Sequence, residues 1–68
     1  MNALRYEFRL AEPVTPTALA AFPELQPAAG SADDVLFGSL RDSSELHAVL
    51  SRFHLMGLTV LDVHRLPD

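Results

Sequence analysis

Residues 4–10 alternate large apolar side chains with other side chains, and this alternation constrains the fold more than any other feature of the sequence. The apolar positions are Leu4, Tyr6, Phe8 and Leu10. Because successive side chains of a strand point to opposite faces, a period of two predicts a strand with one apolar and one charged face. A sheet with one apolar face needs a second layer to cover it. The segment therefore predicts a sheet with helices on one side.

Residues 42–57 have the spacing of three and four that is typical of an amphipathic helix lying on a core. Its apolar stripe consists of Leu46, Val49, Leu50, Phe53 and Met56. Asp42 followed by Glu45 predicts a capping box, in which the Asp42 carboxylate accepts from the Glu45 amide and the Glu45 side chain reaches back to the cap. Gly57 is well placed as a left-handed C-terminal cap.

Prolines separate the first strand from a short helix. Pro13 and Pro16 end the strand, because proline has no amide to donate to a ladder. A helix is then expected over residues 17–22, with Thr15 or Thr17 as its N-terminal cap. The next proline along the chain stops this helix.

Three further segments are predicted to be strands. A weak strand over 24–28, a turn at 30–33 and a better strand over 34–40 read as a hairpin. Pro27 confines the first of these strands to a sheet edge. Residues 58–66 are rich in β-branched side chains and predict a closing strand.

Six elements in the order strand, helix, strand, strand, helix, strand correspond to the split βαβ arrangement, the ferredoxin-like sandwich. We therefore expect one α+β domain over residues 1–68, with two helices on one face of an antiparallel sheet. In this arrangement we expect the first and third strands to lie parallel at the centre. If residues 24–28 form only a loop, the alternative is a three-stranded βαβαβ layer.

Size and composition predict self-association. A domain of 68 residues buries only about 60% of the surface that its unfolded chain exposes, so its own core is marginal. The chain has no Cys, so neither a disulfide nor a Cys/His zinc cluster supplies the missing stability. A homo-oligomer is the remaining common remedy. Nine acidic residues against five basic ones disfavour a nucleic-acid partner.

The apolar runs are too short for a bilayer, which needs about 20 residues, and the N-terminus lacks the order of a signal peptide. The expected compartment is therefore the cytoplasm, with no membrane partner.

Among the histidines, His47 and His54 are separated by roughly 10 Å along one helix, too far to share a metal ion. The isolated glycines and serines form neither a phosphate loop nor a nucleophile elbow, so no cofactor is expected.

One polar surface is a candidate for chemistry. Arg5, Glu7 and Arg9 lie on the charged face of the first strand, beside Asp62 and His64 if the first and last strands are neighbours. A carboxylate near a histidine suits acid–base catalysis. The favoured interpretation is a solvated, ion-paired or subunit-contact face, because no nucleophile or ligand motif converges on it.

Three apolar side chains are candidates for contact with a partner. Val35 and Phe37 lie on the opposite strand face from Leu36 and Leu40, so both faces of that strand are apolar, as a covered outer face requires. Leu55 lies about half a turn from the centre of its helix's core stripe, and we expect it to be exposed.

The chain resembles small stand-alone bacterial proteins that have no assigned activity. The resemblance lies in the order of the elements and in segments 21–25, 35–42, 45–47 and 56–58. The resemblance covers most of the chain and transfers no functional residue. At the level of the fold the chain also resembles ACT-type regulatory domains, which implies pairing between copies and an amino-acid ligand. It departs from them at residues 12–16, which lack the glycine that such ligand loops typically use.

Two functions from different classes follow. The favoured one is a non-catalytic association or regulatory module that acts as a homo-oligomer or an accessory subunit. The alternative is a small cofactor-independent enzyme of the dimeric α+β barrel type, with His64 as base and Glu7 or Asp62 orienting it. The alternative requires a pocket of several hundred Å³ that opens onto His64 or His54.

Overall fold

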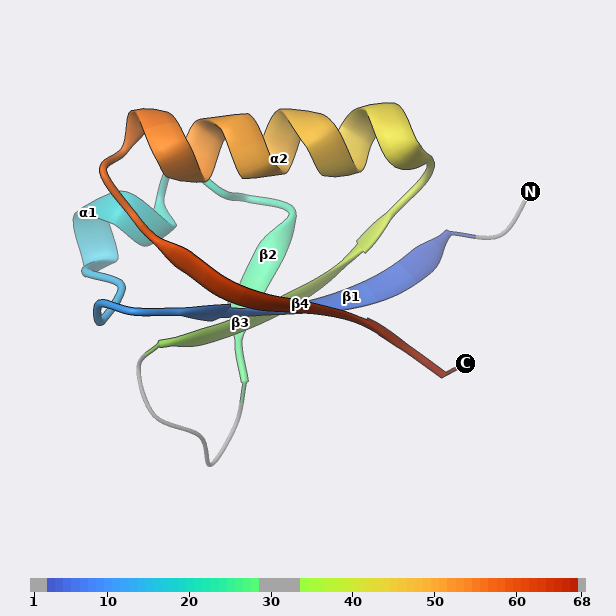
Figure 1. The fold of residues 1–68 in the computed structure, drawn as a ribbon, viewed down its shortest axis with the longest axis horizontal. Coiled ribbons are helices and arrows are strands. Elements are labelled where there is room, and N and C mark those ends of the chain that lie inside the picture. The colour runs from blue at the N-terminus through green and yellow to red at the C-terminus, as the bar shows by residue number, and fades with distance from the viewer. Residues whose placement is uncertain (1–2, 29–33, 68) are drawn as a thin grey trace.

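A four-stranded sheet with two helices over one of its faces makes up the computed structural model, which describes residues 3–28 and 34–67 (Figure 1). Its elements are β1 (Leu4–Leu10), α1 (Pro16–Leu19), β2 (Leu25–Pro27), β3 (Val35–Leu40), α2 (Ser43–Leu55) and β4 (Val60–Leu66). All strand pairs are antiparallel, and the spatial order is β2-β3-β1-β4. The predicted α+β class with an antiparallel sheet and two helices is confirmed.

The central strands β1 and β3 are antiparallel, so the expectation of a parallel central pair is wrong. Leu4 lies opposite Leu40 and Arg9 lies opposite Val35. The reason is that β3 is the returning strand of the β2–β3 pair and lies between β2 and β1, so it runs opposite to both neighbours. β1 shows the predicted two faces, with Phe8 and Leu10 fully buried.

Residues 25–27 form strand β2, which makes the sheet four-stranded, so the three-stranded alternative is wrong. β2 is shorter than the predicted 24–28, and Pro27 lies opposite Leu36 at the sheet edge, where proline is tolerated. Gly38 faces Leu25, and a Cβ at this position would collide with the backbone carbonyl of Glu24. Glycine therefore lets β2 approach β3. The predicted turn at 30–33 lies outside the described residues.

Helix α1 begins earlier and ends earlier than the predicted 17–22. Thr15 is its N-cap, and the Ala18 amide donates to the Thr15 hydroxyl oxygen at 3.1 Å. Pro16 is the first helical residue, where its missing amide costs nothing because no intrahelical partner exists there. Proline thus starts the helix as well as ending the strand region before it.

Helix α2 is capped at both ends largely as predicted. The Glu45 amide donates to Asp42 Oδ1 at 2.9 Å. The Glu45 side chain does not return to the cap amide; it accepts from the amide of Arg41, one residue earlier, at 3.3 Å. Gly57 has a φ of 76°, the left-handed conformation expected after the helix. Met56, predicted in the core stripe, is 42% exposed because the helix has already ended there.

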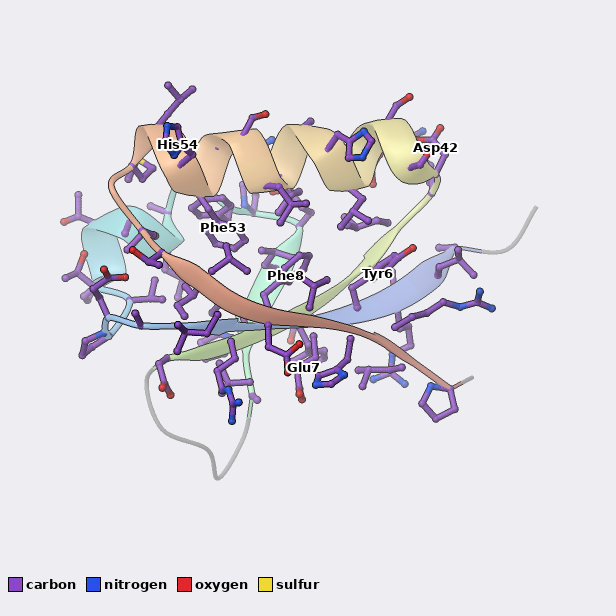
Figure 2. The ribbon with its side chains drawn as sticks, viewed as in Figure 1. Tyr6, Glu7, Phe8, Asp42, Phe53 and His54 are labelled. Atoms are coloured by element: carbon purple, nitrogen blue, oxygen red, sulfur yellow. The ribbon has the colours of Figure 1, made fainter. Side chains whose placement is uncertain are left out.

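The core lies between the sheet and α2 (Figure 2). Its buried residues are Phe8, Leu10, Ala18, Phe22, Leu25, Leu36, Leu40, Val49 and Phe53. Phe53 of α2 stacks on Phe22 with ring centroids 4.5 Å apart and contacts Phe8 of β1 at 5.4 Å. These three rings join the long helix, the central strand and the segment after α1 into one cluster.

A polar clamp ties α2 to the segment before β2. Arg52 donates to the Ala21 carbonyl at 3.0 Å and to the Glu24 carboxylate at 2.8 Å, and its guanidinium lies 5.3 Å from the centroid of the Phe22 ring. Burial alone would raise the pKa of the Glu24 carboxyl, but a hydrogen bond from its own backbone and the interaction with Arg52 together lower this pKa below its usual value.

Candidate interaction surfaces

The face of the sheet turned away from the helices is here named the outer face. The strand registers and the alternation of burial place on it Gln26, Val35, Phe37, Ser39, Arg5, Glu7, Arg9, Asp62, His64 and Leu66. Figure 2 shows Glu7 on this side of the sheet, opposite the side that carries the labelled Phe8 and Phe53. No helix or strand of the described residues packs against the outer face.

The structure brings the predicted polar residues together across β1 and β4. Glu7 lies directly opposite His64, and Arg9 lies opposite Asp62. The polar contact that forms lies within β4 itself, where His64 Nε2 is 2.8 Å from Asp62 Oδ2. The side chains of this pair are 58% and 38% exposed, so water reaches both groups.

Val35 and Phe37 form the apolar part of the outer face. Both are half-buried on β3, and Phe37 lies opposite Glu7 on one side and Gln26 on the other. The Arg5 guanidinium is 5.9 Å from the centroid of the Phe37 ring, within the range of a cation–π contact. Apolar and charged side chains are therefore interleaved on this face.

Leu55 does not belong to the same surface as the other two interface candidates. It is 83% exposed, as predicted, but it lies on α2, in the layer on the other side of the sheet.

Leu61 is 60% exposed and was not predicted as an exposed apolar residue. The register of β4 against β1 shifts between Arg9 and Leu10, next to this residue, and nothing in the sequence marks such a shift.

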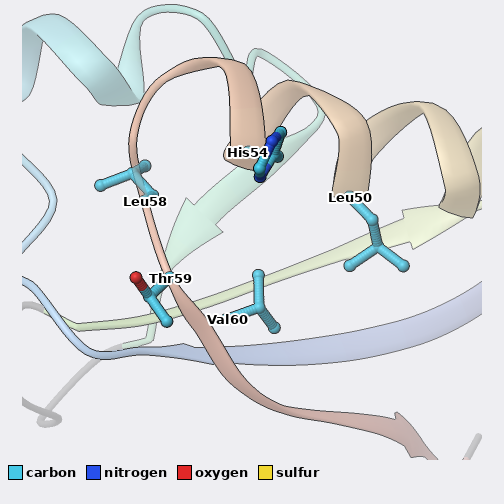
Figure 3. Close-up of a pocket in the computed structure, with 5 residues that line it drawn as sticks. All are labelled: Leu50, His54, Leu58, Thr59 and Val60. Atoms are coloured by element: carbon cyan, nitrogen blue, oxygen red, sulfur yellow. The ribbon is translucent and has the colours of Figure 1, made fainter.

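A groove of about 320 Å³ lies between the end of α2 and the start of β4 (Figure 3). It is lined by Leu50, His54, Leu58, Thr59 and Val60. His54 is the only titratable residue among them, and no carboxylate lines the groove. His64 is not part of the groove, because it lies on the outer face, on the other side of the sheet.

Comparison with known proteins gives one result. The profile of a domain of unknown function, DUF8691, matches residues 5–64. The chain belongs to the DUF8691 family. No curated protein and no solved structure matches it. The DUF8691 match includes every candidate contact residue, from Arg5 on β1 to His64 on β4.

The charged side chains on the outer face of this DUF8691 domain balance one another. The two arginines of this face, Arg5 and Arg9, are balanced by the carboxylates of Glu7 and Asp62.

Within residues 3–28 and 34–67, no three His, Cys, Asp or Glu side chains gather closely enough to hold a metal ion. In the same residues, no helix combines the length and the apolar character needed to cross a membrane.

Proposed function

We propose that this DUF8691 domain is a non-catalytic association module whose copies pair through their outer faces, and that its fold is a ferredoxin-like sandwich. The element order and the strand order β2-β3-β1-β4 support the proposed fold. The observation that carries the proposed function is the outer face itself, in which half-buried Val35 and Phe37 lie among charged side chains and no helix or strand of residues 3–28 and 34–67 covers them.

The charges of the outer face favour a second copy as the occupant. Two arginines and two carboxylates give this face no net charge when His64 is neutral, so two copies do not repel each other. A two-fold axis presents the same patch from both copies, and it can set an arginine of one copy against a carboxylate of the other. Phe37 and Val35 would supply the apolar contact between them.

The polar pair on the outer face supports association more than catalysis. A general base works best in a site that excludes water, whereas the His64 and Asp62 side chains are both open to solvent. The groove that does exist reaches another histidine, His54, and lacks the carboxylate that the enzyme hypothesis requires.

The mass of the protein in solution tests this proposal. Light scattering over a range of concentrations should give an oligomer for the wild type, and Phe37→Glu should halve its mass because it places a carboxylate in the apolar contact. Leu55→Glu is the matched control, since Leu55 is exposed on the helix layer, and it should leave the mass unchanged. Circular dichroism checks that each variant is folded. A wild-type monomer at every concentration would overturn the proposal.

The second candidate is the small cofactor-independent enzyme, and the groove against His54 is the observation that favours it. Its volume of about 320 Å³ is at the lower end of the range for small-molecule sites. A thermal-shift screen with small apolar acids tests it. Stabilisation that is lost in His54→Gln but kept in His47→Gln, on the same helix but outside the groove, would support this candidate over the first.

A further inference from the structure

The sheet has two edge strands, and they differ in how well they resist pairing with another chain. β2 is three residues long and contains Pro27, which has no amide to donate. β4 is seven residues long and contains no proline. Short strands and prolines are two of the devices that keep sheet edges from pairing, and β4 has neither; its register shift lies near Leu61 and leaves residues 62–66 in regular pairing with β1.

The backbone groups at the free edge of β4 can be identified from the hydrogen bonds of β1. The Leu10 amide donates to the Asp34 carbonyl toward β3, whereas the Ala11 amide donates to the Thr59 carbonyl toward β4. Because these directions alternate along a strand, odd-numbered residues of β1 bond to β4, including Glu7 opposite His64. The N–H and C=O groups of Val63 and Arg65 therefore point to the free edge.

The side chains of β4 favour one register with a second copy. Antiparallel self-pairing centred on Asp62 would oppose two carboxylates, and pairing centred on His64 would oppose two imidazoles. Pairing centred on Val63 places Asp62 of each copy opposite His64 of the other, so the complementary contact forms twice. This pattern favours another copy of the same strand as the occupant of the edge.

We propose that the β4 edge is a second contact between copies of this chain, in which two β4 strands pair antiparallel about Val63 to form one eight-stranded sheet. This contact goes beyond the proposed function, because it uses the sheet edge and main-chain hydrogen bonds instead of the outer face. Copies that pair through both surfaces carry two different two-fold contacts, which close into a tetramer where the two axes intersect at right angles.

Proline substitution tests the contribution of the main chain. Arg65→Pro removes an amide that points away from β1, so the β1–β4 ladder keeps its hydrogen bonds. Arg65→Ala removes the same exposed side chain but keeps the amide, and it serves as the matched control. We expect Arg65→Pro to halve the mass in light scattering while Arg65→Ala keeps the wild-type mass. Equal masses for the two variants would overturn the edge contact.

Engineered cysteines test the register, and the natural chain has no Cys to interfere. In the proposed register residue 62 of one copy lies directly opposite residue 64 of the other. Their Cα atoms are about 4.5–5.5 Å apart, within reach of a disulfide. Mild oxidation of an equimolar mixture of Asp62→Cys and His64→Cys should therefore give a cross-linked heterodimer. Neither variant alone should cross-link above Leu55→Cys, which reports random collisions. With outer-face pairing removed by Phe37→Glu, cross-linking of either variant with itself would show another register and overturn this one.

The same oxidation in the Phe37→Glu background separates the two contacts. Asp62 and His64 lie on the outer face, and a disulfide can bridge two packed sheets, so the cross-link is assigned to the edge in the Phe37→Glu background, where outer-face pairing is lost. A cross-link that persists with Phe37→Glu shows that the edge pairs without the outer face. If Phe37→Glu lowers the wild-type mass but the cysteine mixture gives no cross-link, the edge proposal fails and the proposed function stands.

Discussion

The same alternation along the strands forms both faces of the sheet, but the two faces differ in which side chains they carry and in how deeply these are buried. On the helix side, among the described residues, the buried set contains no polar or charged side chain, and Phe8, Phe22 and Phe53 form one aromatic cluster. On the outer face Phe37 is only half-buried and is accompanied by Arg5 and Glu7.

The difference between the faces separates two sources of stability. Contacts on the helix side form whenever the chain folds, so their contribution does not depend on protein concentration. Contacts that the outer face makes with another copy contribute by mass action and grow with concentration. Substitutions on the two faces should therefore differ both in size and in concentration dependence.

Removal of one phenyl ring from each face should give the largest contrast. Phe53 is fully buried, and Phe53→Ala should cost about 3–5 kcal/mol of unfolding free energy because it removes the ring and leaves a cavity. Phe37→Ala should cost about 1 kcal/mol in dilute solution. Urea denaturation measures both, and Phe53→Leu replaces the alanine variant if that variant does not fold.

A higher protein concentration should change the loss of stability at Phe37 but not the loss at Phe53. The loss caused by Phe37→Ala should grow as the protein is concentrated, while the loss caused by the Phe53 variant should stay constant. Equal losses at both positions, or a Phe37→Ala loss that ignores concentration, would show that the two faces do not differ in the way proposed.

Adjacent residues of β3 provide the next test, because they point to opposite faces. Gly38→Ala, on the helix side, should cost about 1–3 kcal/mol, since the added methyl group collides with the carbonyl of Glu24 and pushes β2 away. Ser39→Ala, on the outer face and exposed, should stay within about 0.5 kcal/mol of the wild type. Thermal melts in dilute solution compare the two. A Gly38→Ala melt as high as that of Ser39→Ala would contradict the packing argument.

Features that depend on local sequence were predictable. The strand at residues 4–10, the Asp42 cap and the left-handed Gly57 each follow from a pattern or a backbone requirement within a few residues. The adjacency of Glu7 and His64 followed from the order of the elements. The antiparallel direction of β1 and β3, which was predicted wrongly, also follows from that order, because β3 is antiparallel to β2 and lies between β2 and β1.

Features that depend on contacts between distant segments were not predictable. Arg52 and Glu24 are 28 positions apart, and no spacing in the sequence connects them. The exposure of Leu61 depends on a register shift between two strands, and the groove at His54 needs both the end of α2 and the start of β4. The separation of Leu55 from Phe37 likewise required the position of the helix relative to the sheet.

The smallest expected effect compares the carboxylates of the two regions. Glu24 belongs to the clamp with Arg52 on the helix layer, and Asp62 lies on the outer face. The side chains of the clamp are partly exposed, so Glu24→Gln should cost less than about 1 kcal/mol at neutral pH. Asp62→Asn should stay within about 0.5 kcal/mol of the wild type in dilute solution.

The pH dependence of this loss identifies its origin. The pKa of Glu24 is lowered from 4.5 in the folded state, so the ionised carboxylate stabilises the fold fully above that value and loses its effect as the pH falls through the lowered pKa. Urea denaturation between pH 7 and pH 2.5 should therefore show the wild type and Glu24→Gln converging at the acidic end. A difference that persists there would assign the contribution of Glu24 to packing, and the clamp would then hold β2 by contact alone.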